Sequence, residues 1–273
     1  YSLASLAGLG HIECVRTLIP ITLSLIACRP PQAPEELDDI MSYLFEHHPD
    51  RSKRALTAGT ENLNNWLESH KDETWDGFQI SALSQEAVDE LDDRERDLSD
   101  LIGVAVGYDI DYSVEEVINV ILFADPLEFN QGDIVEYKRT IVEGTEECFA
   151  AKECDRLAYM TEALGNYPLG LEVRSKTMNQ YRWITTDFGD AAIQRTWMME
   201  PAESNWDSIN LDQQYYITAA MPIETGMRRV EAGWVVMALG DLPVPEGIAM
   251  NLAIGTLTSF RDKVEAWKEA HPE

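Results

Sequence analysis

Two cysteines in the middle of the chain are close enough in sequence to bond to each other. Cys148 and Cys154 lie within the segment ECFAAKEC. In an exported chain an even pair predicts a disulfide, and closing so short a loop stabilises a fold by at most about 2–3 kcal/mol. Zinc binding by this pair is disfavoured, because no histidine lies near it in the sequence. We therefore expect a disulfide here, no metal site and no cofactor.

A third cysteine ends an apolar run near the start of the sequence. Residues 18–27 are mostly apolar and follow Arg16, and the prolines that come directly after Cys28 cannot continue a helix. A basic residue, a short apolar core and a small residue before a break are the pattern of a secretory signal. The run is too short for a membrane span, which needs about 20 apolar residues.

The ending Leu25-Ile26-Ala27-Cys28 resembles a bacterial lipoprotein signal. In that family the cysteine is lipidated and becomes the new N-terminus. The resemblance implies that residues 1–27 are a signal peptide and that Cys28 carries lipid. The protein would then be an exported, membrane-anchored lipoprotein that faces the periplasm or the cell surface, with residues 28–34 as a proline-rich tether. A secretory signal without lipidation, or a buried helix with a core thiol, are the alternatives.

Arg195 is a charged residue on a strand face that is otherwise apolar. Strict alternation places it on the same face as Trp197. An inward arginine could bind a ligand carboxylate or phosphate through two parallel hydrogen bonds. It could equally pair with Glu172 or Glu231, or a bulge could place it in solvent. The nearby Arg182 is expected to face solvent.

Large side chains at strand and helix spacing could line a ligand cavity. Besides Arg195, we predict ligand contacts from Trp183, Trp197, Tyr216, Trp234, Met250 and Ile254. Small residues such as Gly255 in the closing helix leave room for a void between helix and sheet. A void with apolar walls accepts apolar guests. The alternative is that the aromatic rings fill the interior.

The sequence contains no signature of an enzyme. It has no nucleophile elbow, zinc-protease helix, Walker loop or dinucleotide-binding glycine motif. A serine or cysteine nucleophile would need a partner histidine, and only His271 comes after the predicted sheet. We assign no catalytic residue and favour a binding protein over an enzyme.

The net negative charge of the chain makes some classes of binding partner unfavourable. The 273 residues carry a formal net charge of −28, and 45% of them are hydrophobic, which is ample for a packed core. The excess of negative charge repels phosphate backbones, so nucleic acid is not an expected partner. It also disfavours adsorption to an anionic membrane surface, so membrane attachment would depend on lipid at Cys28.

Helical periodicity dominates residues 35–100. Apolar residues recur at helical spacing over residues 35–47, 51–70 and 84–98. These helices could form an independent cap, or they could pack on the later part of the chain.

From residue 103 onward the apolar pattern has mostly the period of a strand. Strands are predicted over residues 103–110, 134–142, 169–185, 191–200, 211–221 and 228–239. The stretch 169–185 could be two strands that are broken near Met178. Ser113 and Glu116 predict a capping box that begins a helix after the first strand. A long helix is predicted from about Gly247 to Ala270.

Two stretches have a specific resemblance to a known superfamily. Tyr112–Ile121, with a small polar residue and a glutamate before a valine-rich helix, is similar to the first strand-to-helix junction of the START-like helix-grip superfamily, also called SRPBCC. Val244–Trp267, where a proline introduces the last helix, is similar to its closing segment. The resemblance covers residues 103–270. It implies an α+β fold in which a curved antiparallel sheet grips a long C-terminal helix around an apolar tunnel, behind the helical segment 35–100.

The resemblance implies a function without catalysis. We expect binding or transport of a hydrophobic, lipid-like small molecule in the cavity of a cell-envelope lipoprotein. One alternative is a structural or adaptor lipoprotein whose residues 35–100 contact a protein partner, which would need an exposed apolar patch on those helices. Another is a cyclase- or hydrolase-type enzyme, which would need an arginine, an acid and a tyrosine inside the tunnel.

Overall fold

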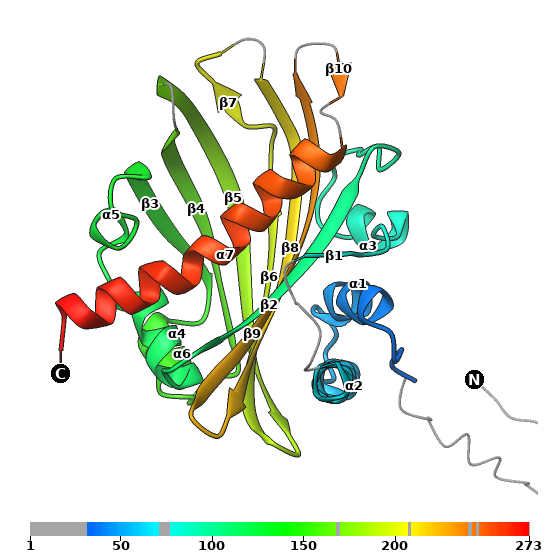
Figure 1. The fold of residues 1–273 in the computed structure, drawn as a ribbon, viewed down its shortest axis with the longest axis vertical. Coiled ribbons are helices and arrows are strands. Elements are labelled where there is room, and N and C mark those ends of the chain that lie inside the picture. Colours follow the sequence, from blue (N-terminus) through cyan, green and yellow to red (C-terminus); the bar gives the residue numbers. More distant parts are fainter. Residues whose placement is uncertain are drawn as a thin grey trace, which may run out of the picture.

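A ten-stranded antiparallel sheet forms the centre of the protein (Figure 1). The computed structural model describes residues 32–70, 77–167, 170–206, 209–239, 242–243 and 246–272. The strands follow the order β1-β2-β9-β8-β6-β5-β4-β3, with β10 beside β9 and β7 beside β5. Their bounds are β1 (Phe78–Gln79), β2 (Ile102–Ile110), β3 (Ile134–Glu143), β4 (Arg156–Tyr167), β5 (Leu171–Thr186), β6 (Gly189–Met198), β7 (Glu203–Ser204), β8 (Ile209–Ile223), β9 (Gly226–Leu239) and β10 (Leu242–Pro243).

The sheet curls around one long helix. The helices are α1 (Leu37–His47), α2 (Arg54–Ser69), α3 (Gln85–Asp89), α4 (Val114–Phe123), α5 (Pro126–Phe129), α6 (Glu146–Ala150) and α7 (Glu246–Ala270). Figure 1 shows α7 crossing the concave side of the sheet diagonally. Its backbone comes closest to β2 and β9 at one margin and to α5 at the other. The predicted architecture, a curved antiparallel sheet that grips a C-terminal helix, is confirmed.

Successive strand residues point to opposite faces, and both faces are buried. The inner face, which meets α7, buries Val106, Tyr181 and Trp183 together with Leu257 and Val264 of the helix. The outer face buries a second set of residues that alternate with the first, including Tyr215 and Trp234. Each strand of the central sheet can therefore contribute to two cores.

The N-terminal helices cover the outer face. Ile40, Leu44 and Phe45 of α1 are fully buried in the same core as Trp234 and Tyr215. The ring of Phe45 meets those of Tyr215 and Trp234 edge-on, with centroids 6.1 and 5.8 Å apart. β1, which comes after these helices in the chain, pairs with β2. Of the two arrangements considered for residues 35–100, the structure therefore has the one in which they pack on the sheet.

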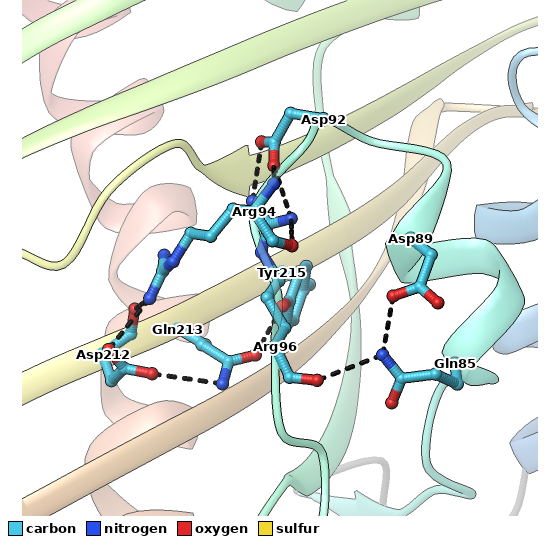
Figure 2. A network of polar contacts seen from close by, with 8 residues as sticks. All are labelled: Gln85, Asp89, Asp92, Arg94, Arg96, Asp212, Gln213 and Tyr215. Carbon is cyan, nitrogen blue, oxygen red and sulfur yellow. Dashed lines mark hydrogen bonds and ion pairs between the residues drawn. The ribbon is translucent and has the colours of Figure 1, made fainter.

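The segment after α2 is less helical than its pattern predicts. The spacing predicts one helix over residues 84–98, but α3 ends at Asp89 and the rest is a loop. Polar side chains attach this loop to β8 (Figure 2). Arg96 binds both carboxylate oxygens of Asp92 at 2.6 Å, and Arg94 binds Asp212 at 2.8 Å. Asp92 also accepts a hydrogen bond from the backbone amide of Arg94 at 3.0 Å, and a local side-chain-to-backbone bond of this kind competes with a helix.

Part of the predicted organisation lies outside the described residues. The signal peptide 1–27, Cys28 and most of the tether 28–34 belong to that part. Within the described residues, none of the helices is both long and apolar enough to cross a membrane.

Candidate functional site

A pocket lies where α4, α5, β3 and β4 meet α7. It has a volume of about 140 Å³. We call it the α4–α5 pocket, and its walls are Val120, Ile121, Ala124, Pro126, Phe129, Asn130, Tyr137, Arg139, Tyr159 and Phe260. Most of these walls are apolar or aromatic. A cavity of about 150 Å³ with apolar walls has room for one benzene-sized molecule, so this pocket fits a group of that size.

A side groove continues the pocket toward the edge strand β3. It has a volume of about 280 Å³ and shares Ala124, Pro126, Tyr137 and Arg139 with the α4–α5 pocket. Its remaining walls are Leu122, Ile141 and Glu146. An elongated molecule could therefore begin in the pocket and extend outward along β3.

The capped ends of two helices position the pocket walls. Ser113 accepts a hydrogen bond from the amide of Glu116, whose carboxylate accepts one in return from the amide of Ser113 at 2.8 Å. This predicted capping box is confirmed and fixes the start of α4. Asp125 accepts hydrogen bonds from the amides of Leu127 and Glu128, and Pro126 is the first residue of α5. Both features favour a new helix directly after α4.

Arg139 links the pocket walls to one another through its hydrogen bonds. Its guanidinium donates to the carbonyls of Leu122 at 2.8 Å and Ile121 at 3.0 Å, to the hydroxyl of Tyr137 at 3.1 Å, and to the carboxylate of Glu146. It also lies 4.5 Å from the ring centroid of Tyr159. With its donors engaged in this way, Arg139 holds the end of α4 against β3 and is not the side chain that a ligand would recruit.

The tyrosine at the back of the pocket is held by a second tyrosine. The hydroxyls of Tyr159 and Tyr181 are 3.0 Å apart, and their rings are stacked. Burial raises the pKa of Tyr159 well above its ordinary value and raises the pKa of Tyr181 to about 12. Both hydroxyls are therefore neutral at physiological pH, and this wall of the pocket carries no charge.

A buried ion pair lies behind Phe260. Arg229 is 5% exposed, and its Nε donates to the carboxylate of Glu231 at 2.8 Å. The guanidinium carbon lies 4.0 Å from the ring centroid of Phe260. Nearby, the hydroxyl of Tyr108 donates to the carbonyl of Leu257 at 3.2 Å. Arg229, Glu231 and Tyr108 have the composition required for the enzyme alternative, but none of them lines the α4–α5 pocket.

The residues predicted to contact a ligand are divided between the two faces of the sheet. Trp183, Tyr216 and Ile254 belong to the inner core beneath α7. Trp197 and Trp234 belong to the outer core, covered by the N-terminal helices. Met250 lies on α7, but its side chain is outside the described part of the structure. The structure therefore does not bring these residues together into one site, and their ligand contacts stay predictions.

The inner predicted residues have protein partners. The indole of Trp183 donates to the carbonyl of Phe149 at 2.8 Å and stacks on its ring. Tyr216 accepts a hydrogen bond from Gln214, and burial together with Glu231 raises its pKa. Gly255 is exposed, and a Cβ placed on it would meet nothing within 4 Å. It thus lies toward open space, which corrects its expected role in creating a void against the sheet.

Arg195 binds α1 instead of facing α7. It donates to the carbonyl of Phe45 at 3.3 Å and to the side chain of Gln180 at 3.0 Å, and it lies over the rings of Phe45 and Trp197. Neither expected acidic partner is used. Arg182 is 1% exposed, which corrects the expectation that it faces solvent. Its Nη1 donates to the carbonyls of His48 and Asp50, just beyond the end of α1.

The predicted disulfide is formed. Cys148 and Cys154 are bonded, with their Cα atoms 5.5 Å apart. Between them Phe149 is fully buried in the inner core. The disulfide therefore closes the loop that places Phe149 on Trp183. Among the described residues there is no cluster of three or more histidine, cysteine, aspartate or glutamate side chains that could hold a metal.

Comparison with known proteins gives matches at the level of structure only. No protein-family model matches the chain. No curated protein matches its sequence. Similar solved structures include a STAR-related lipid transfer protein from Xanthomonas axonopodis, at 10% identity and a TM-score of 0.38, where the match covers 63% of this chain and 97% of that one.

Human STARD10 is similar at 13% identity and a TM-score of 0.40, over 76% of this chain and 83% of its own. A START superfamily protein from Mycobacterium smegmatis is similar at 12% identity and a TM-score of 0.36, over 62% and 97%. The helix-grip description of this chain rests on its own strand order and on the position of α7.

Proposed function

We propose that this protein binds a small apolar molecule, or the apolar part of an amphiphile, in the α4–α5 pocket and the side groove. The observation that carries the proposal is the pocket itself, with mainly apolar walls beside the gripping helix. Its polar wall residues already have protein partners; they are Asn130, Tyr137, Arg139 and Tyr159. Binding would thus gain from apolar burial without leaving buried polar groups unpaired.

The size of the pocket sets the expected affinity. Burying about 150 Å² of apolar ligand surface at ~25 cal/mol per Å² contributes about 4 kcal/mol, which corresponds to roughly millimolar binding. A longer molecule that also fills the side groove would bury about twice that area. We therefore expect dodecan-1-ol to bind more tightly than hexan-1-ol by at least tenfold.

Displacement of a neutral fluorescent probe tests the proposal. Alkan-1-ols of increasing length should displace N-phenyl-1-naphthylamine from the wild-type protein. Ala124→Trp should abolish this, because Ala124 lines both the pocket and the side groove. Ala151→Trp, at an exposed position after α6, is the matched control and should leave displacement unchanged. Equal binding by both variants, or none by the wild type, would refute the proposal.

The cellular setting is proposed on the sequence alone. We infer that Cys28 is lipidated and anchors the protein to a membrane of the cell envelope, since it ends a lipoprotein-like signal. Expression of the full chain in a bacterial host, followed by detergent phase partitioning, tests this. The wild type should enter the detergent phase and Cys28→Ser should remain in the aqueous phase.

The adaptor alternative has less support in the structure. The exposed large apolar side chains of the described residues are Phe123, Leu127, Val135, Ile141, Val142, Tyr167 and Trp206. All of them lie outside the helical segment 35–100, whose large apolar side chains are buried or partly buried among the described residues. The apolar patch that would favour partner binding by these helices is thus not among the described residues.

A further inference from the structure

The α4–α5 pocket and the Arg229–Glu231 pair are separated by a single aromatic ring. Phe260 is a wall of the pocket, and its ring meets that of the neighbouring wall Phe129 at a centroid distance of 6.0 Å. The guanidinium of Arg229 lies over the same ring at 4.0 Å, yet Arg229 is not a wall of the pocket. The ring of Phe260 therefore stands between the apolar volume and the buried charge.

Behind the ring of Phe260, the guanidinium of Arg229 could bind an anion. Its hydrogen bond to Glu231 uses Nε, and its guanidinium also meets the hydroxyl of Tyr108, whose pKa is raised by burial. That hydroxyl is therefore neutral, and a neutral acceptor binds a guanidinium more weakly than a carboxylate does. A ligand that reached past Phe260 would thus meet a group that favours an anionic head. A ligand stopped at Phe260 meets only a ring.

We propose that Phe260 is the specificity-determining residue of the pocket: it closes the inner end and restricts the ligand to molecules whose innermost part is apolar and uncharged. The proposal rests on the function proposed above. It predicts selection for neutral molecules. An apolar end of about benzene size fills the pocket, and a head that points outward along the side groove meets the carboxylate of Glu146, which disfavours an anionic head. Placing a charged head in the closed pocket would desolvate it without a partner, which is strongly unfavourable.

Neutral and charged ligands of equal chain length test the proposal. Hexan-1-ol and hexanoate, and dodecan-1-ol and dodecanoate, are compared at pH 7 by displacement of N-phenyl-1-naphthylamine. The wild type should bind each alkanol at least tenfold more tightly than the matching carboxylate. Phe260→Ala should open the pocket to Arg229 and raise the affinity for carboxylates relative to that for the matching alkanols at least tenfold.

Two further variants assign the effect to Arg229 and guard against a folding defect. Adding Arg229→Met to Phe260→Ala should cancel the gain for carboxylates, because the anion then has no guanidinium to bind. Phe260→Trp keeps the partition closed with a larger ring, so it should preserve the preference for alkanols and weaken binding of the longer one. Circular dichroism on each variant confirms folding. If Phe260→Ala does not fold, Phe260→Leu replaces it, with a smaller gain expected.

The outcomes separate this inference from the proposed function. If the wild type binds alkanols and carboxylates equally, or if opening at Phe260 leaves the ratio unchanged, the partition proposal is overturned while apolar binding stands. If the wild type binds no alkanol, both proposals fail. A carboxylate gain that persists after Arg229→Met also overturns the partition proposal, since the ring would then not be shielding Arg229.

Discussion

The outer and inner faces of the sheet are made by the same strands but are packed differently. On the outer face α1 and α2 lie flat against the strands, and Ile40, Phe45 and Trp234 are completely buried. On the inner face α7 contacts mainly the margins, α4 and α6 pack beside it, and a pocket of about 140 Å³ remains between α4, α5 and α7. The difference shows where a ligand fits and where stability comes from.

The buried arginines on the sheet strands follow the same division. Arg182 and Arg195 on the outer face donate to backbone carbonyls in and just after α1. They attach the helical layer to the sheet. Arg229 on the inner face instead pairs with the carboxylate of Glu231 and meets the neutral hydroxyl of Tyr108. The outer arginines thus hold two layers of the fold together, whereas the inner one is bonded to side chains of its own face.

The largest expected effect comes from truncating one phenylalanine on each face. Phe45→Ala removes a fully buried ring from the outer core and should lower the free energy of unfolding by about 3–5 kcal/mol. Phe129→Ala removes a half-buried ring from the pocket wall and should cost less than half as much. Urea unfolding monitored by circular dichroism measures both. Equal losses would show that the two faces are packed to the same density.

The disulfide should have the next largest effect, and it should act on the inner face. Replacing both Cys148 and Cys154 with serine opens a short loop and should cost ~2 kcal/mol. Because Phe149 between them stacks on Trp183, near-ultraviolet circular dichroism of the tryptophans should also change. A thiol reductant should reproduce the change in the wild type and have no effect on the double variant. A loss of stability without a tryptophan signal would place the effect elsewhere.

Acid should weaken the outer face selectively through His48. Burial, and then the charge of Arg195, hold the pKa of this histidine well below its ordinary value near 6.5. Below pH 6.5 the unfolded chain therefore binds a proton that the folded chain does not, so stability falls with decreasing pH. The loss is at most about 1.4 kcal/mol for each pH unit until the folded pKa is reached.

Two histidine variants measure this contribution between about pH 7.5 and 5, a window that spans the ordinary histidine pKa. His48→Gln should remove the contribution, so the stability of that variant should fall less steeply with acid than that of the wild type. His271→Gln, which removes an exposed histidine near the end of the chain, is the control variant. Parallel curves for all three proteins would mean that the pKa of His48 is not lowered in the folded chain.

The smallest expected effect compares two helix caps. Ser113→Ala removes the cap of α4 on the pocket side, and Ser84→Ala removes the cap of α3 on the outer side. Each should cost about 1 kcal/mol of stability. Only Ser113→Ala should also weaken alkanol binding, because α4 supplies Val120 and Ile121 to the pocket. Similar losses of affinity in both variants would argue that general loosening is responsible.

Much of the fold was predictable from local patterns. The helices near residues 35–47 and 51–70, the capping box at Ser113 and the long terminal helix all have strong periodic or capping signals. β4 was missed because Arg156–Tyr167 mixes leucine, alanine, methionine and glutamate, which favour helices, with few alternating apolar positions. β5 is one continuous strand, Leu171–Thr186, and is not broken near Met178, since both of its neighbours pair through that point.

The site was less predictable, because alternation gives two faces without saying which one meets α7. Trp197 and Trp234 have the same strand periodicity as Trp183, yet they lie on the other face. The burial of Arg182 depends on the carbonyls of His48 and Asp50, which lie far earlier in the chain. The pocket walls come from separate elements, and two of these, α5 and β4, were not predicted. Phe260 did have a signal, as an apolar position of the terminal helix.

Gly255 bears on how this protein could be engineered. Glycine within a helix is less favourable than alanine by roughly 1 kcal/mol, and nothing surrounds this position that an added methyl group would touch. Gly255→Ala would therefore stabilise α7 without a clash with a neighbouring residue. The native residue is glycine, so this single substitution offers a gain in thermal stability that does not require changing any residue near the pocket.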